Sequence, residues 1–391
     1  MSNFIDVAYD SLNKYGEELC GDKVEVVRTE DSVIIVISDG LGSGVKANIL
    51  ATLTCKIAAT MLKEGVSIFE TVDTIMQTLP VCSVRKLAYS TFTIIKIHEN
   101  GQVYVAEYDN PPIFLMHKGK EPLDIQNNAI LVNDHIVKES SFLMNEGDAL
   151  TVVSDGVVHA GVGGILNLGW QWSNVEEYLE RQAHVEKCAA NISKSLIDAC
   201  HSLYAGKPGD DATVVTAKLR HSEEVDLFTG PPLNSEDDSW VIGKLSQAKG
   251  RKVICGGTAA KIAARELNQD IVTNMDFIDP EVPPTAHIKG IDLVTEGVLT
   301  LRKTVDKIKA YINNNTKQEG RSSFDKLDGA SQLAKLLIED CTHLNIWVGK
   351  AVNPAHQNPD FPIDLGIKLK VVAELADLME ILGKRIKLTY M

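Results

Sequence analysis

Two apolar segments of this chain end in an aspartate followed by a glycine. Asp39-Gly40 follows Val33–Ile37, a run of five β-branched residues, and Asp155-Gly156 follows the apolar run Ala149–Val153. Such runs are typical of strands buried on both faces, so we expect each aspartate at the rim of a sheet. Glycine permits a sharp turn that points a carboxylate and the Gly40 carbonyl into one space. These oxygens are the ligands that hard divalent cations prefer.

Further aspartates are expected at the same rim. Asp210 and Asp211 directly precede an apolar strand, so they open a strand instead of closing one. Asp22 precedes the strand Val24–Val27, and antiparallel pairing of this strand with the one that ends at Asp39 would put Asp22 beside Asp39. Antiparallel neighbours could bring the other acidic ends to the same edge of one sheet. Like charges without an evident lysine or arginine repel each other, and bound metal is the simplest neutraliser. The alternative at each position is a plain turn residue.

The elements that must position these aspartates alternate between strands and helices. The residue patterns predict strands at 24–27, 33–37, 88–97, 102–108, 113–117 and 149–153, and helices at 45–63, 68–79 and within 175–203. Many strands with a few long helices, closing at about residue 220, predict one α+β domain in which helices pack against sheets.

The first predicted helix begins directly after the turn that contains Asp39. Its apolar residues Val45, Ile49, Leu53, Ile57 and Met61 recur every four positions, which is typical of an amphipathic helix. We interpret this stripe as a packing face. A shift of the helix would also move the acidic turn, so the helix is a candidate lever for regulation.

Taken in order, these motifs resemble a known family. Gly21-Asp22, Ser38–Gly44, Ser154–Val157 and Asp210–Val214 are similar to the motifs of the type 2C (PP2C) metal-dependent serine/threonine protein phosphatases, and in particular of their bacterial SpoIIE-like branch in sporulation and stress signalling. The resemblance spans about residues 15–220. It implies an α-β-β-α sandwich of two antiparallel sheets and a pair of Mn²⁺ or Mg²⁺ ions.

The resemblance also implies roles for individual residues. Asp39 would bridge both metals, the Gly40 carbonyl and Asp22 would complete one site, and Asp155 and Asp210 would hold the other. Asp39, Asp155 and Asp210 are thus the candidate catalytic residues. Two ions can activate a water for direct attack on a phosphomonoester, so no nucleophilic side chain is needed. The implied substrate is phosphoserine or phosphothreonine in a partner protein.

The sequence departs from the family pattern at several positions. Asp211 is interpreted as a neighbour of the metal ligands, and His159 as a surface or core residue where many relatives have an acid. Arg28 and Arg85 are the candidates for an arginine that grips phosphate, each with a surface charge as the alternative. The acid that protonates the leaving group is unassigned.

Beyond the phosphatase-like region, which we delimit as 1–221, the composition changes. Residues 222–240 are acidic and rich in turn formers, which indicates a linker. Residues 241–391 predict a smaller α/β domain with a regulatory or partner-binding role, and its end is expected to run as a strand at 367–371, a helix at 372–382 and a strand at 386–390. Within it, Gly256-Gly257 joins a predicted strand to a helix and could present backbone N–H groups to an anion; tight packing is the alternative.

Composition limits the partners. The 391 residues carry a formal net charge of −14, which argues against nucleic acid or an anionic membrane as the main partner. The seven cysteines are widely spaced without a Cys-x-x-Cys pair, so we expect free thiols. The first residues lack an apolar stretch of signal-peptide type and we expect no membrane span downstream, so a cytoplasmic protein is predicted. The resemblance to the SpoIIE-like branch implies a bacterial protein. A homodimer is among the assemblies that the sequence allows.

The sequence therefore predicts a metal-dependent phosphoserine/phosphothreonine protein phosphatase with a C-terminal regulatory domain. Two alternatives stay open. One is a non-catalytic signalling scaffold that keeps the phosphatase fold, and the other is a ligand sensor that acts through the C-terminal α/β domain. The crowding of like charges favours the enzyme, because a scaffold gains nothing from it.

Overall fold

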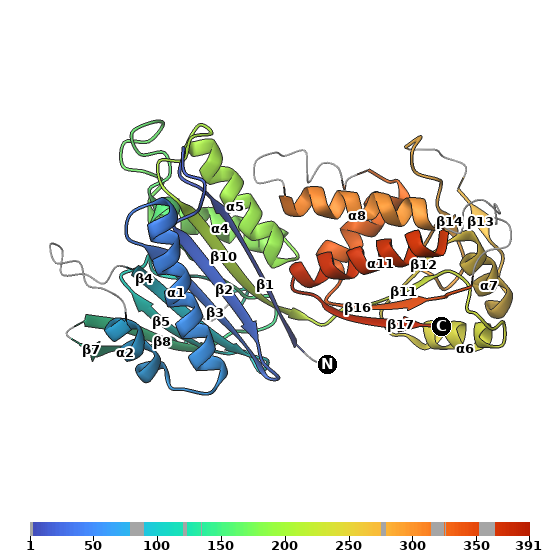
Figure 1. The fold of residues 1–391 in the computed structure, drawn as a ribbon, viewed down its shortest axis with the longest axis horizontal. Helices are drawn as coiled ribbons and strands as arrows, with labels where there is room; N and C mark the ends of the chain where they lie inside the picture. The colour runs from blue at the N-terminus through green and yellow to red at the C-terminus, as the bar shows by residue number, and fades with distance from the viewer. Residues whose placement is uncertain are drawn as a thin grey trace. The chain divides into compact units, whose positions relative to one another are not determined.

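The chain divides into two compact units, Met1–His221 and Ser222–Met391, each described here by itself (Figure 1). The structure is a computed structural model, and it describes residues 3–391 except 79–89, 120–122, 134, 275–278, 314–323, 325 and 352–363.

The first unit contains two antiparallel sheets. Sheet A has the order β1-β10-β9-β6, from β1 (Asn3–Leu12), β10 (Ala212–His221), β9 (Ala149–Val153) and β6 (Phe114–Met116). Sheet B has the order β2-β3-β4-β5-β8-β7, from β2 (Asp22–Arg28), β3 (Ser32–Gly40), β4 (Ser90–His98), β5 (Gln102–Tyr108), β8 (His135–Leu143) and β7 (Gln126–Val132). The apolar run of β3 is fully buried, as the sequence predicted.

The two sheets pack face to face between helices (Figure 1). One core cluster joins residues of both sheets, among them Ile35 and Val152. A second cluster packs α1 (Gly44–Lys63) and α2 (Ile68–Thr78) on sheet B, and a third packs α4 (Trp172–Val185) and α5 (Ala189–Leu203) on sheet A. The predicted α-β-β-α sandwich is thereby confirmed.

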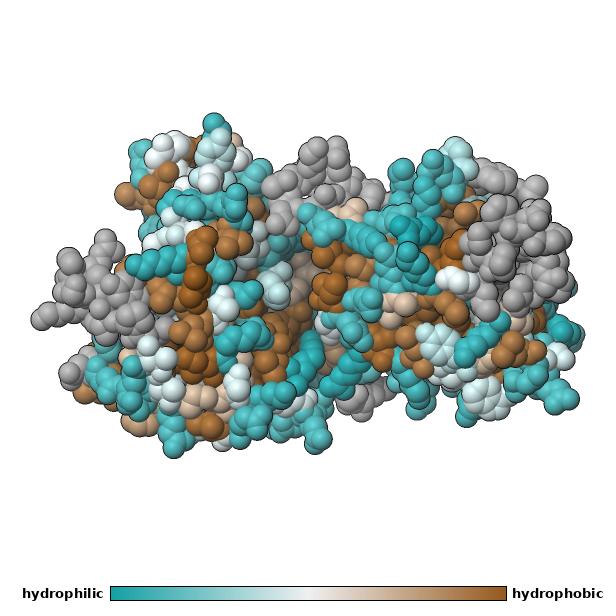
Figure 2. Space-filling model, in the orientation of Figure 1, coloured by the Kyte–Doolittle hydropathy of each residue, from teal (hydrophilic) through white to brown (hydrophobic). Residues whose placement is uncertain are grey.

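Helix α1 turns the opposite face to the sheet from the one that the sequence indicated. Its small residues, such as Ala47 and Ala51, are buried against sheet B, whereas Val45 and Ile49 are about 60% exposed and Leu53 is also exposed. Figure 2 shows this apolar strip along α1. Small residues permit the close approach of helix and sheet, so the face that carries them packs against the sheet.

The same helix is the only one in the described residues that is long and apolar enough to cross a membrane by length and composition, which the sequence reading did not expect. A core helix of a soluble protein passes the same test. Because α1 packs on β2 and β3, the structure gives its apolar character a packing explanation.

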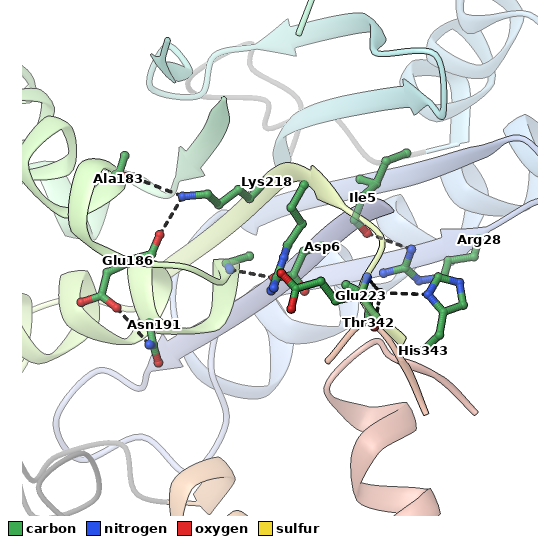
Figure 3. Close-up of polar contacts among 12 residues, drawn as sticks. Ile5, Asp6, Arg28, Ala183, Glu186, Asn191, Lys218, Glu223, Thr342 and His343 are labelled. Atoms are coloured by element: carbon green, nitrogen blue, oxygen red, sulfur yellow. Dashed lines mark hydrogen bonds and ion pairs between the residues drawn. The ribbon is translucent and has the colours of Figure 1, made fainter. Parts of the chain in front are cut away.

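Buried polar contacts tie sheet A to the helices that cover it (Figure 3). The Asp6 carboxylate on β1 accepts a hydrogen bond from the Ala189 amide at the start of α5, at 3.0 Å, and pairs with Arg220 at 3.3 Å. The Lys218 ammonium on β10 donates to the carbonyls of Ala183 and Glu186, at 3.2 and 2.7 Å. These contacts offset part of the cost of burying the charged groups, although burial still lowers the pKa of Lys218.

The second unit is built around a mostly parallel seven-stranded sheet, sheet C. Its order is β13-β14-β15-β12-β11-β16-β17, from β13 (Val272–Thr273), β14 (Ala286–His287), β15 (Leu293–Thr295), β12 (Arg251–Cys255), β11 (Glu224–Thr229), β16 (His343–Val348) and β17 (Arg385–Tyr390). Its helices are α6 (Asp237–Gln247), α7 (Gly257–Leu267), α8 (Val298–Asn313), α10 (Gly329–Lys335), a π-helical turn (Leu336–Asp340) and α11 (Asp364–Ile381). The five parallel strands follow the chain order 3-2-1-4-5, which is that of doubly wound nucleotide-binding folds.

Two predictions for the second unit were wrong. Residues 222–240 are not a linker, because they contain β11, which lies between β12 and β16, and the start of α6. Residues 367–371, predicted as a strand, lie within α11. In both cases the residue types describe local preference, whereas pairing with distant strands or packing of a long helix decides the structure. The six described cysteines are free thiols, as expected.

Candidate metal centre

The hairpin of β2 and β3 places two of the predicted ligands opposite each other. Asp22 is the direct antiparallel partner of Asp39, and the Gly40 amide donates to the Gly21 carbonyl at 3.3 Å. The predicted antiparallel pairing is therefore present. Because Asp22 begins one strand and Asp39 ends the other, both lie at the same end of sheet B.

Asp155 and Asp210 flank a strand pair of sheet A. Strand β9 ends at Val153, opposite Val214 of β10, so the residues after β9 and before β10 meet at one end. The Ser154 amide donates to the Thr213 carbonyl at 3.0 Å, and the Thr213 amide donates to the Ser154 hydroxyl at 2.9 Å, which fixes this crossing. The aspartates thus come from two sheets, not from one sheet edge as the sequence reading proposed.

Electrostatic coupling joins the acidic ends of the two sheets. Burial raises the pKa of Asp39 to about 9, with further increases from the charges of Asp22, Asp155, Asp210 and Asp211. Burial likewise raises the pKa of Asp155, and the charge of Asp210 adds to the effect. The charges of these aspartates therefore act on one another, and we refer to Asp22, Asp39, Asp155, Asp210 and Asp211 as the acidic cluster.

Asp22 lies deepest in this cluster. Its side chain is buried, and both of its carboxylate oxygens lack a hydrogen-bond partner. Burial raises the pKa of Asp22 to about 7; the hydroxyls of Ser154 and Thr213 are near enough to lower this pKa, but neither makes a hydrogen bond of normal geometry to the carboxylate. A buried, unpaired carboxylate is costly unless a cation or a proton compensates it.

Two glycines of the motifs allow close backbone approach. A Cβ atom on Gly40 would lie 2.1 Å from the Ala47 carbonyl oxygen of α1, and one on Gly156 would lie 2.0 Å from the Asp211 carbonyl oxygen. Any side chain at either position would push apart the segments that carry the aspartates. Close packing thus requires glycine at positions 40 and 156, in addition to the turn that the sequence indicated.

Lys14 was missed by the sequence reading. Its ammonium lies 3.6 Å from the Asp210 carboxylate, and its backbone amide donates to the Asp211 carboxylate at 2.9 Å. Lys14 is therefore a cation beside the cluster, contrary to the expectation of none. Lys14 lies in no motif, so only the tertiary structure reveals it.

Asn110 was also missed. Its side-chain amide donates to the Thr93 hydroxyl of β4 at 2.9 Å and to the Val153 carbonyl of β9 at 3.1 Å, and so it joins sheet B to sheet A beside the acidic ends. The available signal was its place before the pair Pro111-Pro112, which restricts the backbone at this crossing.

The remaining candidates lie outside the cluster or at its margin. His159 is exposed at the end of the short helix α3 (Asp155–Val158), where its charge lowers the pKa of Asp155. Arg28 donates to the Ile5 carbonyl at the other end of β2, about 20 Å from Asp22 by strand length, so it does not serve this site. Arg85 lies outside the described residues.

The residues fit a centre for hard divalent ions. Within the described part of the chain, no three histidine, cysteine, aspartate or glutamate side chains form a ready-made metal site as they lie. However, the cluster offers only oxygen donors, which suit Mg²⁺ and Mn²⁺. The orphaned oxygens of Asp22 add a buried donor that has no protein partner.

Comparison with protein families gives a match to one family model over part of the chain. Residues 29–220 match the family model of Stage II sporulation protein E (SpoIIE); this range includes Asp39, Asp155 and Asp210 but not Asp22. No curated protein matches the sequence.

Several solved structures are similar to this chain. The PP2C phosphatase domain of SpoIIE from Bacillus subtilis, with a fragment of its regulatory domain, is 21% identical with a TM-score of 0.47, and the match covers 56% of this chain and 64% of that chain. RsbX in complex with magnesium is 19% identical with a TM-score of 0.40, covering 55% and 95%. The serine/threonine phosphatase of S. agalactiae is 14% identical with a TM-score of 0.40, covering 55% and 99%.

Proposed function

Because residues 29–220 match the family model of Stage II sporulation protein E (SpoIIE), we propose that the protein is a PP2C-type phosphatase. It would hydrolyse phosphoserine or phosphothreonine in a partner protein, with two Mn²⁺ or Mg²⁺ ions as cofactors. The observation that supports the proposal is that Asp22 lies opposite Asp39 and that the charges of Asp22, Asp155 and Asp210 act on the Asp39 carboxyl. We further propose that the protein acts in the cytoplasm.

The chain's own residues would divide the work as follows. Asp39 would contact both ions, Asp22 and the Gly40 carbonyl would hold one, and Asp155 and Asp210 would hold the other. Bound ions would supply an activated water and would stabilise charge on the phosphoryl oxygens. Lys14 beside Asp210 would adjust the charge of the second site, and Asn110 would keep the two sheets in register.

A direct test is hydrolysis of p-nitrophenyl phosphate by the full chain. We expect activity that depends on added Mn²⁺ and that is lost in Asp39→Asn. Glu177→Gln, an exposed substitution on α4, serves as the control and should keep full activity. If the folded wild-type protein neither binds Mn²⁺ by calorimetry nor hydrolyses the substrate, the scaffold alternative is correct.

A sensor role for the second unit is supported by the strand order of sheet C. Doubly wound sheets bind ligands beyond the carboxyl ends of their strands. Helix α6 begins with Asp237 and Asp238, which disfavour an anion there, whereas α7 begins at Gly256-Gly257 without acidic residues. Titration of nucleotides into the full chain should give a thermal shift that Gly257→Asp abolishes; no shift with any nucleotide would refute this role.

A further inference from the structure

A groove with a volume of about 740 Å³ runs beside the edge strand β6 in the first unit. One wall is the face of α4 that carries Trp172, Glu176 and Glu180, and Glu107 of β5 lies on another side. Ile113 and Leu115, which pack against the core between the sheets, form its apolar base. The volume is in the range of pockets that hold ligands or peptide side chains.

The wall on α4 is built from residues spaced by four. Trp172, Glu176 and Glu180 therefore share one helix face. The Trp172 indole is fixed, because its Nε1 donates to the Pro112 carbonyl at 3.0 Å and its ring stacks on Phe114 with the ring centres 4.8 Å apart. The groove thus combines a rigid aromatic surface with a row of carboxylates.

The charge of the groove is negative. Glu107 is about nine-tenths buried; one of its oxygens accepts a hydrogen bond from the Ile113 amide at 3.0 Å. Burial raises the pKa of Glu107, and the exposed Lys138 on β8 lowers it in part. Burial and the charge of Glu180 raise the pKa of Glu176.

Among the residues that line the groove, the described chain provides no lysine or arginine, and the one histidine, His117, lies 2.9 Å from Asp148. An occupant with positive charge would therefore meet carboxylates, because the one histidine of the lining is already hydrogen-bonded to Asp148. This complementarity favours a cationic partner over an acidic or neutral one.

The groove runs away from the acidic cluster. Strand β6 pairs with β9 so that Phe114 lies opposite Thr151 and Met116 opposite Ala149. The Pro112–Ile113 end of the groove is therefore near the end of β9 that leads to Asp155, and His117 is about 13 Å farther along the strand direction. Because β6 is the last strand of sheet A, its outer edge can pair with an added extended segment.

We propose that this groove binds an extended segment of the protein substrate in which basic and apolar residues alternate. Lysine or arginine side chains would lie against Glu176, Glu180 and Glu107, and apolar side chains would lie on Trp172 and Leu115. That the bound segment belongs to a substrate rests on the proposed phosphatase function, but binding of the segment to the groove does not require metal. The groove would thereby select substrates with a basic sequence beside the phosphorylated residue.

The first test is binding without metal. A fluorescein-labelled nine-residue peptide of alternating arginine and leucine is titrated with the full chain in EDTA at low salt, with fluorescence anisotropy as the readout. We expect saturable binding that weakens about tenfold in the double variant E176Q/E180Q, as for the loss of two exposed ion pairs. The matched control E177Q, one position along α4 and paired with Arg181, should bind within twofold of wild type.

The proposal is overturned if a peptide with glutamate in place of arginine binds equally well, or if E177Q weakens binding as much as E176Q/E180Q. Equal unfolding temperatures of the three proteins exclude a folding defect as the cause.

The second test separates this inference from the phosphatase proposal. In Mn²⁺, E176Q/E180Q should hydrolyse p-nitrophenyl phosphate at the wild-type rate, and it should show a raised KM with unchanged kcat on a phosphoserine peptide that has a basic flank. Peptide binding without any hydrolysis would refute the proposed phosphatase function and would leave the peptide-binding role of the groove intact. Hydrolysis with the same KM in the wild type and in E176Q/E180Q would refute the peptide-binding role of the groove and would leave the phosphatase function intact.

Discussion

Keeping the carboxylates of Asp22 and Asp39 charged in the folded protein costs free energy, which bound metal would offset. Both carboxyl groups have a raised pKa because burial disfavours their charge, and the other aspartates of the cluster increase the effect. Functional sites often store such unfavourable interactions, and the rest of the fold compensates for them.

This arrangement predicts how the metal-free protein responds to pH. A carboxyl group whose pKa is raised by folding stabilises the fold while it is protonated, and this contribution is lost as pH rises through its folded pKa. In EDTA, we therefore expect the unfolding temperature to fall between about pH 5 and pH 9, the range set by the values near 7 and 9 and the ordinary aspartate pKa near 4.

The variant Asp39→Asn should flatten this pH profile and raise the stability of the metal-free protein at pH 8 by about 1 kcal/mol, because asparagine is neutral and folding no longer has to protonate this buried position. Added Mn²⁺ should stabilise the wild type, by about 2.7 kcal/mol at a hundredfold excess over Kd, and the variant much less. A wild-type unfolding temperature that is constant from pH 5 to pH 9 would contradict the prediction.

At the scale of elements, the site depends on how closely α1 approaches β3. The Ala47 carbonyl oxygen of α1 lies where a side chain on Gly40 would be. Helix α1 and the acidic turn are therefore in tight contact, so a shift of α1 would displace the turn.

We expect Gly40→Ala to lower the free energy of unfolding by about 2 kcal/mol or more, because backbone atoms must shift to admit the methyl group. It should also weaken Mn²⁺ binding. Gly243→Ala is the control, since a Cβ there meets no atom within 4 Å and alanine favours the helix α6. Denaturant titration monitored by circular dichroism measures the free energy of unfolding of both variants. Equal stability of the two variants would count against a tight contact between Gly40 and Ala47.

A second element-scale feature is the link between the sheets through Asn110. We expect Asn110→Ala to destabilise the fold by about 1–2 kcal/mol, because it leaves the Val153 carbonyl without its side-chain donor. The exposed Asn128→Ala on β7 should cost much less, since the Asn128 amide makes a long, solvent-exposed hydrogen bond of 3.5 Å to Glu139. Guanidinium denaturation of both variants is the measurement, and an equal loss in both would argue that Asn110 has no bridging role.

At the scale of the whole molecule, the two units have separate hydrophobic cores. In the second unit one core cluster includes Phe228 of β11 together with Ile254 of β12 and Val241 of α6. Strand β11 lies between β12 and β16, so the segment that resembles a linker by composition is central to this unit.

A fragment of residues 222–391 should therefore fold and unfold cooperatively, whereas one of residues 241–391 should not, because it lacks β11 and leaves the facing edges of β12 and β16 unpaired. Thermal unfolding followed by circular dichroism compares the two. Cooperative unfolding of the shorter fragment would show that β11 is dispensable.

The sandwich fold was implied by the resemblance of the motifs to a known family. By itself, the sequence determined six strands of the first unit and the order of the acidic motifs. These follow from local signals, because a run such as Val33–Ile37 must be buried and an aspartate after it must lie at its end. The antiparallel hairpin likewise determined that Asp22 faces Asp39.

Only the tertiary structure decided that the aspartates converge from two sheets, that Lys14 and Asn110 join them, and which face of α1 is buried. It also decided that β11 belongs to sheet C and that α4 and β6 form an acidic groove. The physical reason is common to these features. Each depends on contacts between residues far apart in the chain, whose energies of packing and charge are not encoded in the local pattern of any one segment.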